Sequence, residues 1–213
     1  MMIAEELLLL ITDDDSGRIK ASWLDYGLAG AVLAELALMG RVRLTERGEP
    51  GTRPNRVVVT DDSPTDNPIF DDVLHRLGGK SQFRSNSVNR ISRHLRKPLQ
   101  QRLVDAGVLT PRRSKFMGFA YTRFVQANPD PEIEVRMRLH HVLVEGAEPD
   151  PSTAALIAVL AALGHVHKAV PRGDRRAMNR RAKELRKQYW AAETAYQVIQ
   201  ATQAAVVAAA SSS

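Results

Sequence analysis

The chain contains no cysteine among its 213 residues. Disulfide bonds and thiolate metal sites are therefore excluded, and the fold must be held by packing alone, which is typical of a cytoplasmic protein. Glycine-rich phosphate-binding loops and the G-x-S-x-G nucleophile motif are missing as well. Because no nucleophile, base or cofactor motif can be assembled, we expect neither an enzyme nor a cofactor-binding protein.

Long hydrophobic runs are also missing. The two longest apolar stretches, 27–39 and 153–163, have 13 and 11 residues, whereas a membrane-spanning helix needs about 20. We expect both to be buried helices, with 153–163 as the central one. The N-terminal stretch has an apolar middle like that of a signal peptide, but Glu5 and Glu6 stand where positive charge is required, so it is predicted to be a short amphipathic helix.

Alternating apolar residues predict two β-hairpins, one from "RVRL" and "NRVVVT" and one within "VLTPRRSKFMGFAYTRF". Helical periodicity dominates elsewhere, although Pro98 predicts a kink or a new helix start. The prediction is a mainly α protein with one domain, residues 1–213, in which helices pack around a central hydrophobic helix and β-hairpins are peripheral. Residues 209–213 are expected to fray.

Metal sites are not predicted. Asp13 and Asp15 are spaced as in a calcium loop, but Leu24 occupies the position of the required bidentate glutamate, which favours an acidic surface turn. Two histidine pairs, 140/141 and 165/167, lack a ligand-type partner four residues further on. Structural or surface roles are therefore expected for these histidines.

Acidic residues are absent from one long segment. Residues 73–104 carry eight Lys or Arg and no Asp or Glu, and residues 168–187 carry nine basic residues against two acidic ones. The net charge of +6 therefore conceals segregated positive charge, which predicts an anionic partner, either nucleic acid or a membrane surface. The cations of 168–187 spread around their helix, which favours a solvated surface there.

In the first basic segment the cations form a stripe. With about 100° per residue, Arg90, Arg93, Arg96 and Lys97 fall on one side of a helix and apolar residues on the other. The following residues also fit a winged-helix DNA-binding protein, because a helix, a glycine turn and a basic hairpin succeed one another. Since 100–106 has few residues suited to reading bases, nucleic acid is the less favoured partner.

Four ordered blocks carry a family resemblance: "EELLLLITDDDSGRI", "YGLAGAVLAELALMGRVRL", "DDSPTDNPIFDDVL" and "SRHLRKPLQQRLVDAGVL". Together they resemble the Golgi phosphoprotein 3 family, including its shorter bacterial members, from about Ile3 to the C-terminal helix. The resemblance implies a mainly helical fold. It also implies a peripheral protein of the cytoplasmic membrane face that binds phosphatidylinositol 4-phosphate through a basic pocket in an anionic phospholipid membrane.

The resemblance further implies which residues form that pocket. Two family arginines fall on Arg93 and Arg96, and the pocket tryptophan corresponds to Trp23. Arg90 and Lys97 would add supporting charge. A third family arginine is replaced by an alanine, Ala29, so we expect a weaker phosphoinositide-like headgroup site than one with three arginines.

In eukaryotic members of that family an apolar hairpin after "GVL" helps membrane insertion. The corresponding segment here supplies Phe116, Met117, Phe119, Tyr121 and Phe124. The alternative is a hairpin that packs on its own domain or on a second subunit. The hairpin is therefore predicted to contact either a membrane or a second copy of the chain.

Overall fold

The computed structural model describes residues 1–19, 21, 23–79, 81–116, 119–188, 193, 196, 197, 199–201, 203, 204, 207 and 208. The predicted tail, 209–213, lies outside these described residues. Along the chain the elements are α1 (Ile3–Ile11), α2 (Leu24–Leu38), β1 (Val42–Leu44), β2 (Arg56–Val59), α3 (Pro68–Leu77), β3 (Gln82–Phe83), α4 (Arg84–Asp105), β4 (Leu109–Phe116), β5 (Phe119–Gln126), α5 (Asp130–Leu143), α6 (Pro151–Ala162), α7 (Val166–Ala169) and α8 (Arg175–Gln188).

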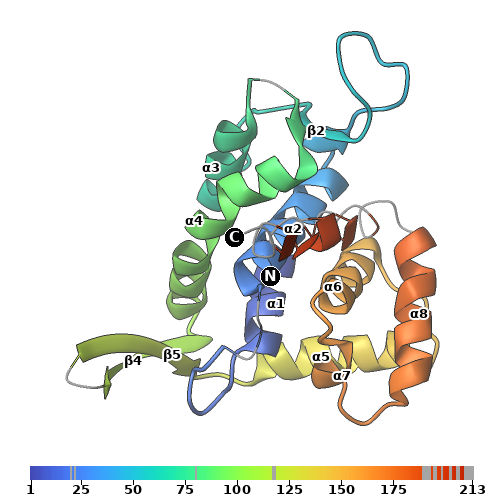
Figure 1. Cartoon of the computed structure of the whole chain (residues 1–213). Coiled ribbons are helices and arrows are strands. Elements are labelled where there is room, and N and C mark those ends of the chain that lie inside the picture. The colour runs from blue at the N-terminus through green and yellow to red at the C-terminus, as the bar shows by residue number, and fades with distance from the viewer. Residues whose placement is uncertain are drawn as a thin grey trace.

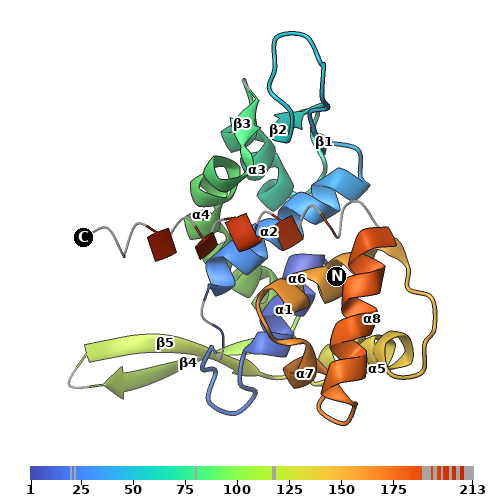
Figure 2. The same cartoon turned by 45° about the vertical axis from the view of Figure 1, so that its right-hand side comes forward.

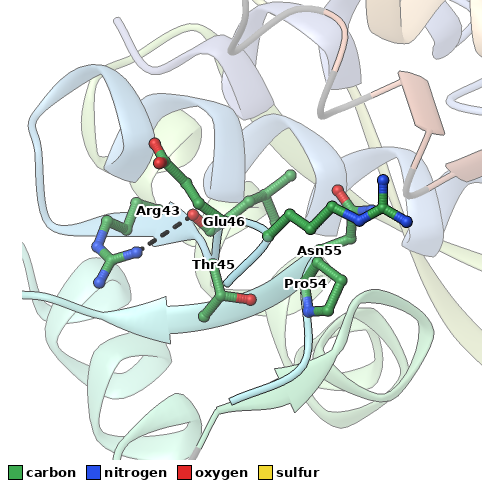
Figure 3. A pocket seen from close by; sticks show the side chains of 7 residues that line it. Arg43, Thr45, Glu46, Pro54 and Asn55 are labelled. Atoms are coloured by element: carbon green, nitrogen blue, oxygen red, sulfur yellow. Dashed lines mark hydrogen bonds between the residues drawn. The ribbon is translucent and has the colours of Figure 1, made fainter. Parts of the chain in front are cut away.

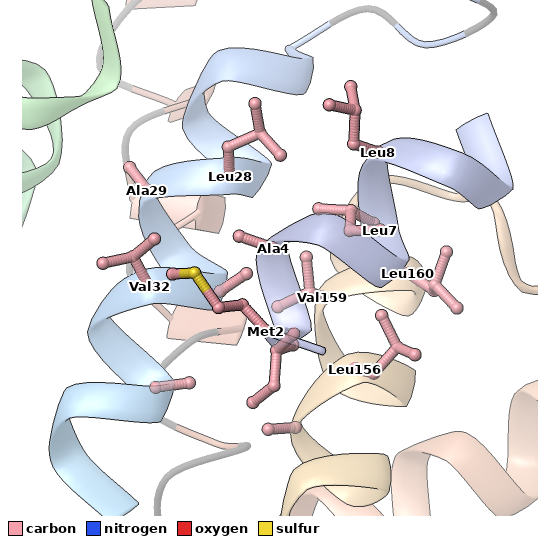
Figure 4. Close-up of a cluster of buried hydrophobic side chains, with 14 of the residues drawn as sticks. Met2, Ala4, Leu7, Leu8, Leu28, Ala29, Val32, Leu156, Val159 and Leu160 are labelled. Carbon is pink, nitrogen blue, oxygen red and sulfur yellow. The ribbon is translucent and has the colours of Figure 1, made fainter. Parts of the chain in front are cut away.

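Three apolar helices form the centre of the molecule. Figure 4 shows α1, α2 and α6 packed against one another through side chains that include Leu7, Leu28 and Leu156, each completely or almost completely buried. Burying a leucine fully stabilises a fold by about 1.5–3 kcal/mol. The mainly helical class with peripheral hairpins is confirmed, while the central position expected for 153–163 is shared by three helices.

The two apolar stretches are buried helices, as predicted. The first stretch forms most of α2, which begins at Leu24, and the second forms most of α6. Asp150 caps α6, because its carboxylate accepts hydrogen bonds from the backbone N–H groups of Ser152 and Thr153. Every helix in the described part of the chain is too short or too polar to traverse a lipid bilayer.

The N-terminal helix α1 is buried along its entire length, so the prediction of an amphipathic helix is wrong. Its two acidic residues are paired instead of solvated. Arg102 donates to Glu5 Oε1 over 2.8 Å, and Arg138 donates to Glu6 Oε2 over 2.6 Å. Burial still raises the pKa of Glu6, against the opposing effect of Arg138. The paired carboxylates allow a helix with two acids to be enclosed on all sides.

Two small antiparallel sheets lie outside the helices, as predicted. In the first, β1 and β2 pair with Val42 opposite Val59, and β3 adds a third strand too short to show alternation in the sequence. The second is the β4–β5 hairpin, whose last pair is Phe116 and Phe119. In both views this hairpin extends away from the helices as an arm (Figures 1 and 2).

The arm is attached at its base to the acidic turn after α1. Arg123 donates to the backbone oxygen of Ser16 over 3.3 Å. Gly17 adopts a left-handed φ of 62°, and a Cβ added there would collide with the backbone oxygen of Phe124. A side chain at position 17 is therefore incompatible with this close approach.

Helix α4 is continuous through Pro98, so no new helix starts there. A proline removes the hydrogen bond to the carbonyl four residues earlier, here that of His94. Both residues are on the exposed side of α4, where water can take the place of the missing donor. The exposed position explains why the helix continues.

Candidate functional site

Helix α4 separates apolar and cationic residues onto opposite sides, as the sequence predicts. Its apolar side packs against α2 and α3, and it contains fully buried Val88, Ile91, Leu95 and Leu99. Arg90, Arg93 and Lys97 lie exposed on the other side, and Arg96 is partly exposed. The burial of the apolar side therefore fixes the direction in which the cations point.

The start of α2 lies against this cationic side. Arg96 Nε donates to Asp25 Oδ1 over 2.9 Å, and Arg96 Nη2 lies 2.7 Å from the same oxygen. Asp25 stands in the first turn of α2, where an acidic side chain interacts favourably with the helix dipole. The ion pair therefore joins α4 to the beginning of α2.

Trp23 immediately precedes α2 and has a left-handed backbone, with φ at 67°. This conformation is uncommon for a residue with a large side chain. Its ring lies 5.6 Å from the Tyr26 ring between centroids, at an angle of 42°. Asp25 lies between these two aromatic residues in the sequence. Its ion pair with Arg96 therefore places the arginine at the same end of α2 as Trp23.

The other stripe cations have a different environment. Within the described part of the chain, no hydrogen bond or ion pair involves the side chains of Arg90, Arg93 or Lys97. Arg93 precedes Arg96 by three residues and thus lies on the same helix face. An exposed guanidinium near a partly engaged one is an arrangement that can bind an anion with several oxygens.

Ala29, which the family resemblance matches to a third arginine, is completely buried. Figure 4 shows it among the side chains of the helical core. In this structure the Cβ of an arginine at position 29 would lie inside the core instead of on the surface. The described site therefore contains the arginines of α4 alone.

The residues predicted on the arm fall into different environments. Tyr121 is 41% exposed, whereas Phe124 packs against the buried core cluster. Phe116 and Phe119 are paired at the tip end of the two strands, and Met117 lies outside the described residues. Arg112, Arg113 and Lys115 are also exposed on the arm. The prediction of an apolar contact did not include these cations, although the segment "PRRSK" contains them.

A hollow of about 830 Å³ lies in the loop between β1 and β2 (Figure 3). Arg43 and Arg47 are among its lining residues. The charge of Arg43 is compensated, because its guanidinium donates to both oxygens of Glu49 over 3.0 and 2.6 Å. None of the stripe residues lines this hollow, so it is not part of the candidate site.

Metal binding finds no support in the described residues, which contain no group of three or more His, Asp or Glu able to hold an ion. His140 and His141 both contact Glu145 on the surface, at 3.0 and 2.6 Å. The pKa of Glu145 is lowered by these contacts, most by the one with His141.

The acidic turn after α1 is closed by Asp13, whose carboxylate accepts hydrogen bonds from the backbone N–H and the hydroxyl of Ser16.

Asp25 is a site residue that the sequence pattern does not identify. An acidic residue in the first helical turn was its signal, but its partner Arg96 lies 71 residues further along the chain. Position in sequence alone therefore could not show that one stripe arginine is engaged and the others are not. The structure divides the stripe into a paired member and three exposed members.

Comparison with known proteins agrees with this architecture. The sequence model described as Golgi phosphoprotein 3 (GPP34) matches residues 3–202. Vacuolar protein sorting-associated protein 74 of Eremothecium gossypii is 26% identical over 165 residues, which make up 68% of this chain and 49% of that relative. The family is non-enzymatic, and its known members include peripheral Golgi proteins that bind phosphatidylinositol 4-phosphate. With a match over nearly its whole length, this chain belongs to the Golgi phosphoprotein 3 (GPP34) family.

Proposed function

We propose that this protein is a peripheral membrane protein of the cytoplasmic membrane face that binds phosphatidylinositol 4-phosphate or another anionic headgroup. The ligands are Arg93 and Arg96 of α4, with Trp23 beside them and Arg90 and Lys97 as supporting charge. The observation that carries the proposal is that Arg93 is exposed and has no ion pair among the described residues, one turn from Arg96 of α4, which pairs with Asp25 at the start of α2. Family membership supports the class of ligand.

The chemistry favours a phosphomonoester. A guanidinium can give two parallel hydrogen bonds to a phosphate, and a phosphomonoester has more charge and more acceptor oxygens than the phosphodiester of an ordinary lipid. Two arginines separated by three residues lie on one helix face, so both can reach one phosphate. Neutral lipids offer no comparable acceptor group, so the stripe should bind them weakly.

Asp25 orients Arg96, one of the two arginines that bind the headgroup in this proposal. Both contacts from Arg96 use the single oxygen Oδ1 of Asp25, and an arginine has five N–H donors. The remaining donors of Arg96 can therefore bind phosphate while the carboxylate holds the guanidinium near Trp23. The same carboxylate also weakens the attraction of an incoming anion, since it places negative charge beside the site.

The arm supplies a second contact with the membrane in this proposal. Tyr121 is exposed, and a ring with a polar hydroxyl suits the boundary between headgroups and acyl chains. Arg112, Arg113 and Lys115 are also exposed, and each cation near an anionic leaflet adds about 1 kcal/mol. If Tyr121→Asp changes the oligomeric state and leaves vesicle binding intact, the arm contacts a second copy of the chain.

Vesicle flotation tests the proposed function. Three vesicle types of equal size are compared: phosphatidylinositol 4-phosphate, phosphatidylserine at the same total charge, and neutral lipid alone. The proposal predicts recovery with the phosphomonoester lipid at least several times that with phosphatidylserine, and none with neutral lipid. Equal binding to both anionic vesicles would reduce the site to a diffuse positive surface. Tight binding of duplex DNA with a steep salt dependence would support a nucleic-acid-binding protein instead.

A further inference from the structure

A second hollow, separate from the α4 stripe, lies between the end of α6, α7 and α8. It encloses about 550 Å³, which is within the range of pockets for small molecules. Its walls come from these helices and from a residue near the C-terminus. The lining residues are Ala161, Gly164, His167, Arg175, Asn179, Ala182, Lys183, Arg186 and Tyr196.

One face of α8 supplies the polar wall of the hollow. Arg175, Asn179 and Lys183 follow one another at intervals of four residues, so they form a column along the helix. His167 faces them from α7. The described lining contains no aspartate or glutamate. The polar side chains of the lining therefore provide hydrogen-bond donors and positive charge.

The cations of α8 divide into paired and unpaired members. Arg181 donates to Glu148 over 2.9 Å, and Arg186 lies 2.8 Å from Glu193. Arg186 also stacks on the Tyr196 ring, 3.8 Å from its centroid. Arg175 and Lys183 have no hydrogen bond or ion pair within the described part of the chain. Glu148 and Glu193 therefore pair with Arg181 and Arg186, and no described carboxylate forms an ion pair with the cations of the column.

The histidine opposite the column is close enough to these cations for its pKa to depend on them. The pKa of His167 is lowered, first by burial and then by the cations Arg175 and Lys168 and by His165. A bound dianion would cancel the repulsion from these neighbours and raise the pKa of His167. The ring is thus a built-in reporter of an anion in the hollow.

We propose that this hollow binds a phosphomonoester. Arg175 provides a fork of donors, Lys183 a point charge, and Asn179 a neutral donor between them, which together match the oxygens of a phosphate dianion. The volume exceeds that of a phosphate group, so the remainder of a small phosphorylated molecule fits beside Tyr196. Arg186 is held by Glu193 and Tyr196 and forms a wall of the hollow.

The position of the hollow sets it apart from the α4 stripe. Helix α4 packs on α2, α2 on α6, and α6 on α8, and both views show α4 and α8 on different sides of the apolar centre (Figures 1 and 2). A flat bilayer that contacts α4 therefore cannot also contact the column on α8. This arrangement favours a soluble phosphorylated ligand over the headgroup of the same membrane.

The test is an NMR titration of the histidine resonances with inorganic phosphate. We expect a saturable shift of His167 and an increase of its pKa by at least half a unit. Arg175→Ala combined with Lys183→Ala should weaken phosphate binding at least tenfold. The matched control combines Arg176→Ala with Lys187→Ala, which removes two exposed cations of α8 outside the hollow and should change binding less than twofold.

Two outcomes would overturn the proposal: no saturable shift at His167, or an equal loss in the control variant. Flotation of the Arg175/Lys183 double variant on vesicles with phosphatidylinositol 4-phosphate distinguishes the sources of the phosphate. Unchanged flotation assigns a soluble ligand, and lost flotation assigns a lipid headgroup. Arg93→Ala should leave the phosphate titration unchanged, so failure of the α4 site and failure of this hollow are separable.

Discussion

Arg96 and Asp25 form an ion pair between α4 and the first turn of α2, with 2.9 Å from Nε and 2.7 Å from Nη2 to the same carboxylate oxygen. The two residues are 71 positions apart. Through this pair the cationic stripe is joined to the segment that carries Trp23. The side chains of both partners are about two-fifths exposed, so the pair contributes at most about 1 kcal/mol to folding.

Asp25→Asn should therefore affect binding more than stability. We expect a loss of less than about 1 kcal/mol in unfolding free energy and a several-fold increase in binding to anionic vesicles, because a competing negative charge disappears. Flotation and urea unfolding measure the two effects. Asp61→Asn removes a comparably placed partner of Arg41 and serves as the control; an equal increase in both variants would mean that only net charge matters.

Glu35 makes the stability of the fold depend on pH. Burial, together with Glu5 and Glu6, raises its pKa to about 7, although the backbone N–H of Ile3 donates to it. A carboxyl whose pKa is raised on folding contributes stability that is complete below about pH 4.5 and is lost as the pH rises through 7. The protein should accordingly be more resistant to unfolding on the acidic side of this window.

Glu35→Gln keeps an acceptor for Ile3 and removes the charge. The variant should match the wild type near pH 4.5 and exceed its unfolding free energy by about 3 kcal/mol above pH 8. Urea unfolding at the two pH values measures the difference. Glu46→Gln, at an exposed position, should show no such trend. A pH-independent effect of Glu35→Gln would contradict the account.

Part of this fold can be predicted from the sequence, and these carboxylates belong to the part that cannot. The apolar helices and both hairpins follow from local periodicity, and so does the stripe of α4. The all-round burial of α1 does not, because the partners of Glu5 and Glu6 are 97 and 132 residues away. Likewise, the engagement of Arg96 by Asp25 depends on tertiary packing and has no local signature.

Gly17→Ala should loosen the base of the arm. The left-handed φ is strained for any L side chain, and a Cβ would meet the backbone oxygen of Phe124. We expect a loss of about 2 kcal/mol or more, together with faster amide exchange in β5. Gly51→Ala has a similar φ of 72° but open space around it. If both variants lose equal stability, the contact with Phe124 is unimportant.

Ala29→Arg should fail to improve headgroup binding. The residue is completely buried, and an unpaired charge in the core costs several kcal/mol. We expect a large drop in thermal stability and no increase in flotation. Ala177→Arg, at an exposed helical position of α8, should be tolerated. A stable Ala29→Arg variant with tighter phosphoinositide binding would show that position 29 can reach the headgroup.

The headgroup site on α4 is tested most directly by flotation of wild type, Arg93→Ala and Arg96→Ala on vesicles with phosphatidylinositol 4-phosphate. The control is Arg176→Ala, an exposed cation of α8 without an ion pair among the described residues. Loss of one charge-assisted contact, about 1.5–3 kcal/mol, corresponds to at least a tenfold loss in affinity. We predict that loss for Arg93→Ala and Arg96→Ala and less than a twofold change for Arg176→Ala. Equal losses in all three variants would contradict a headgroup site on α4.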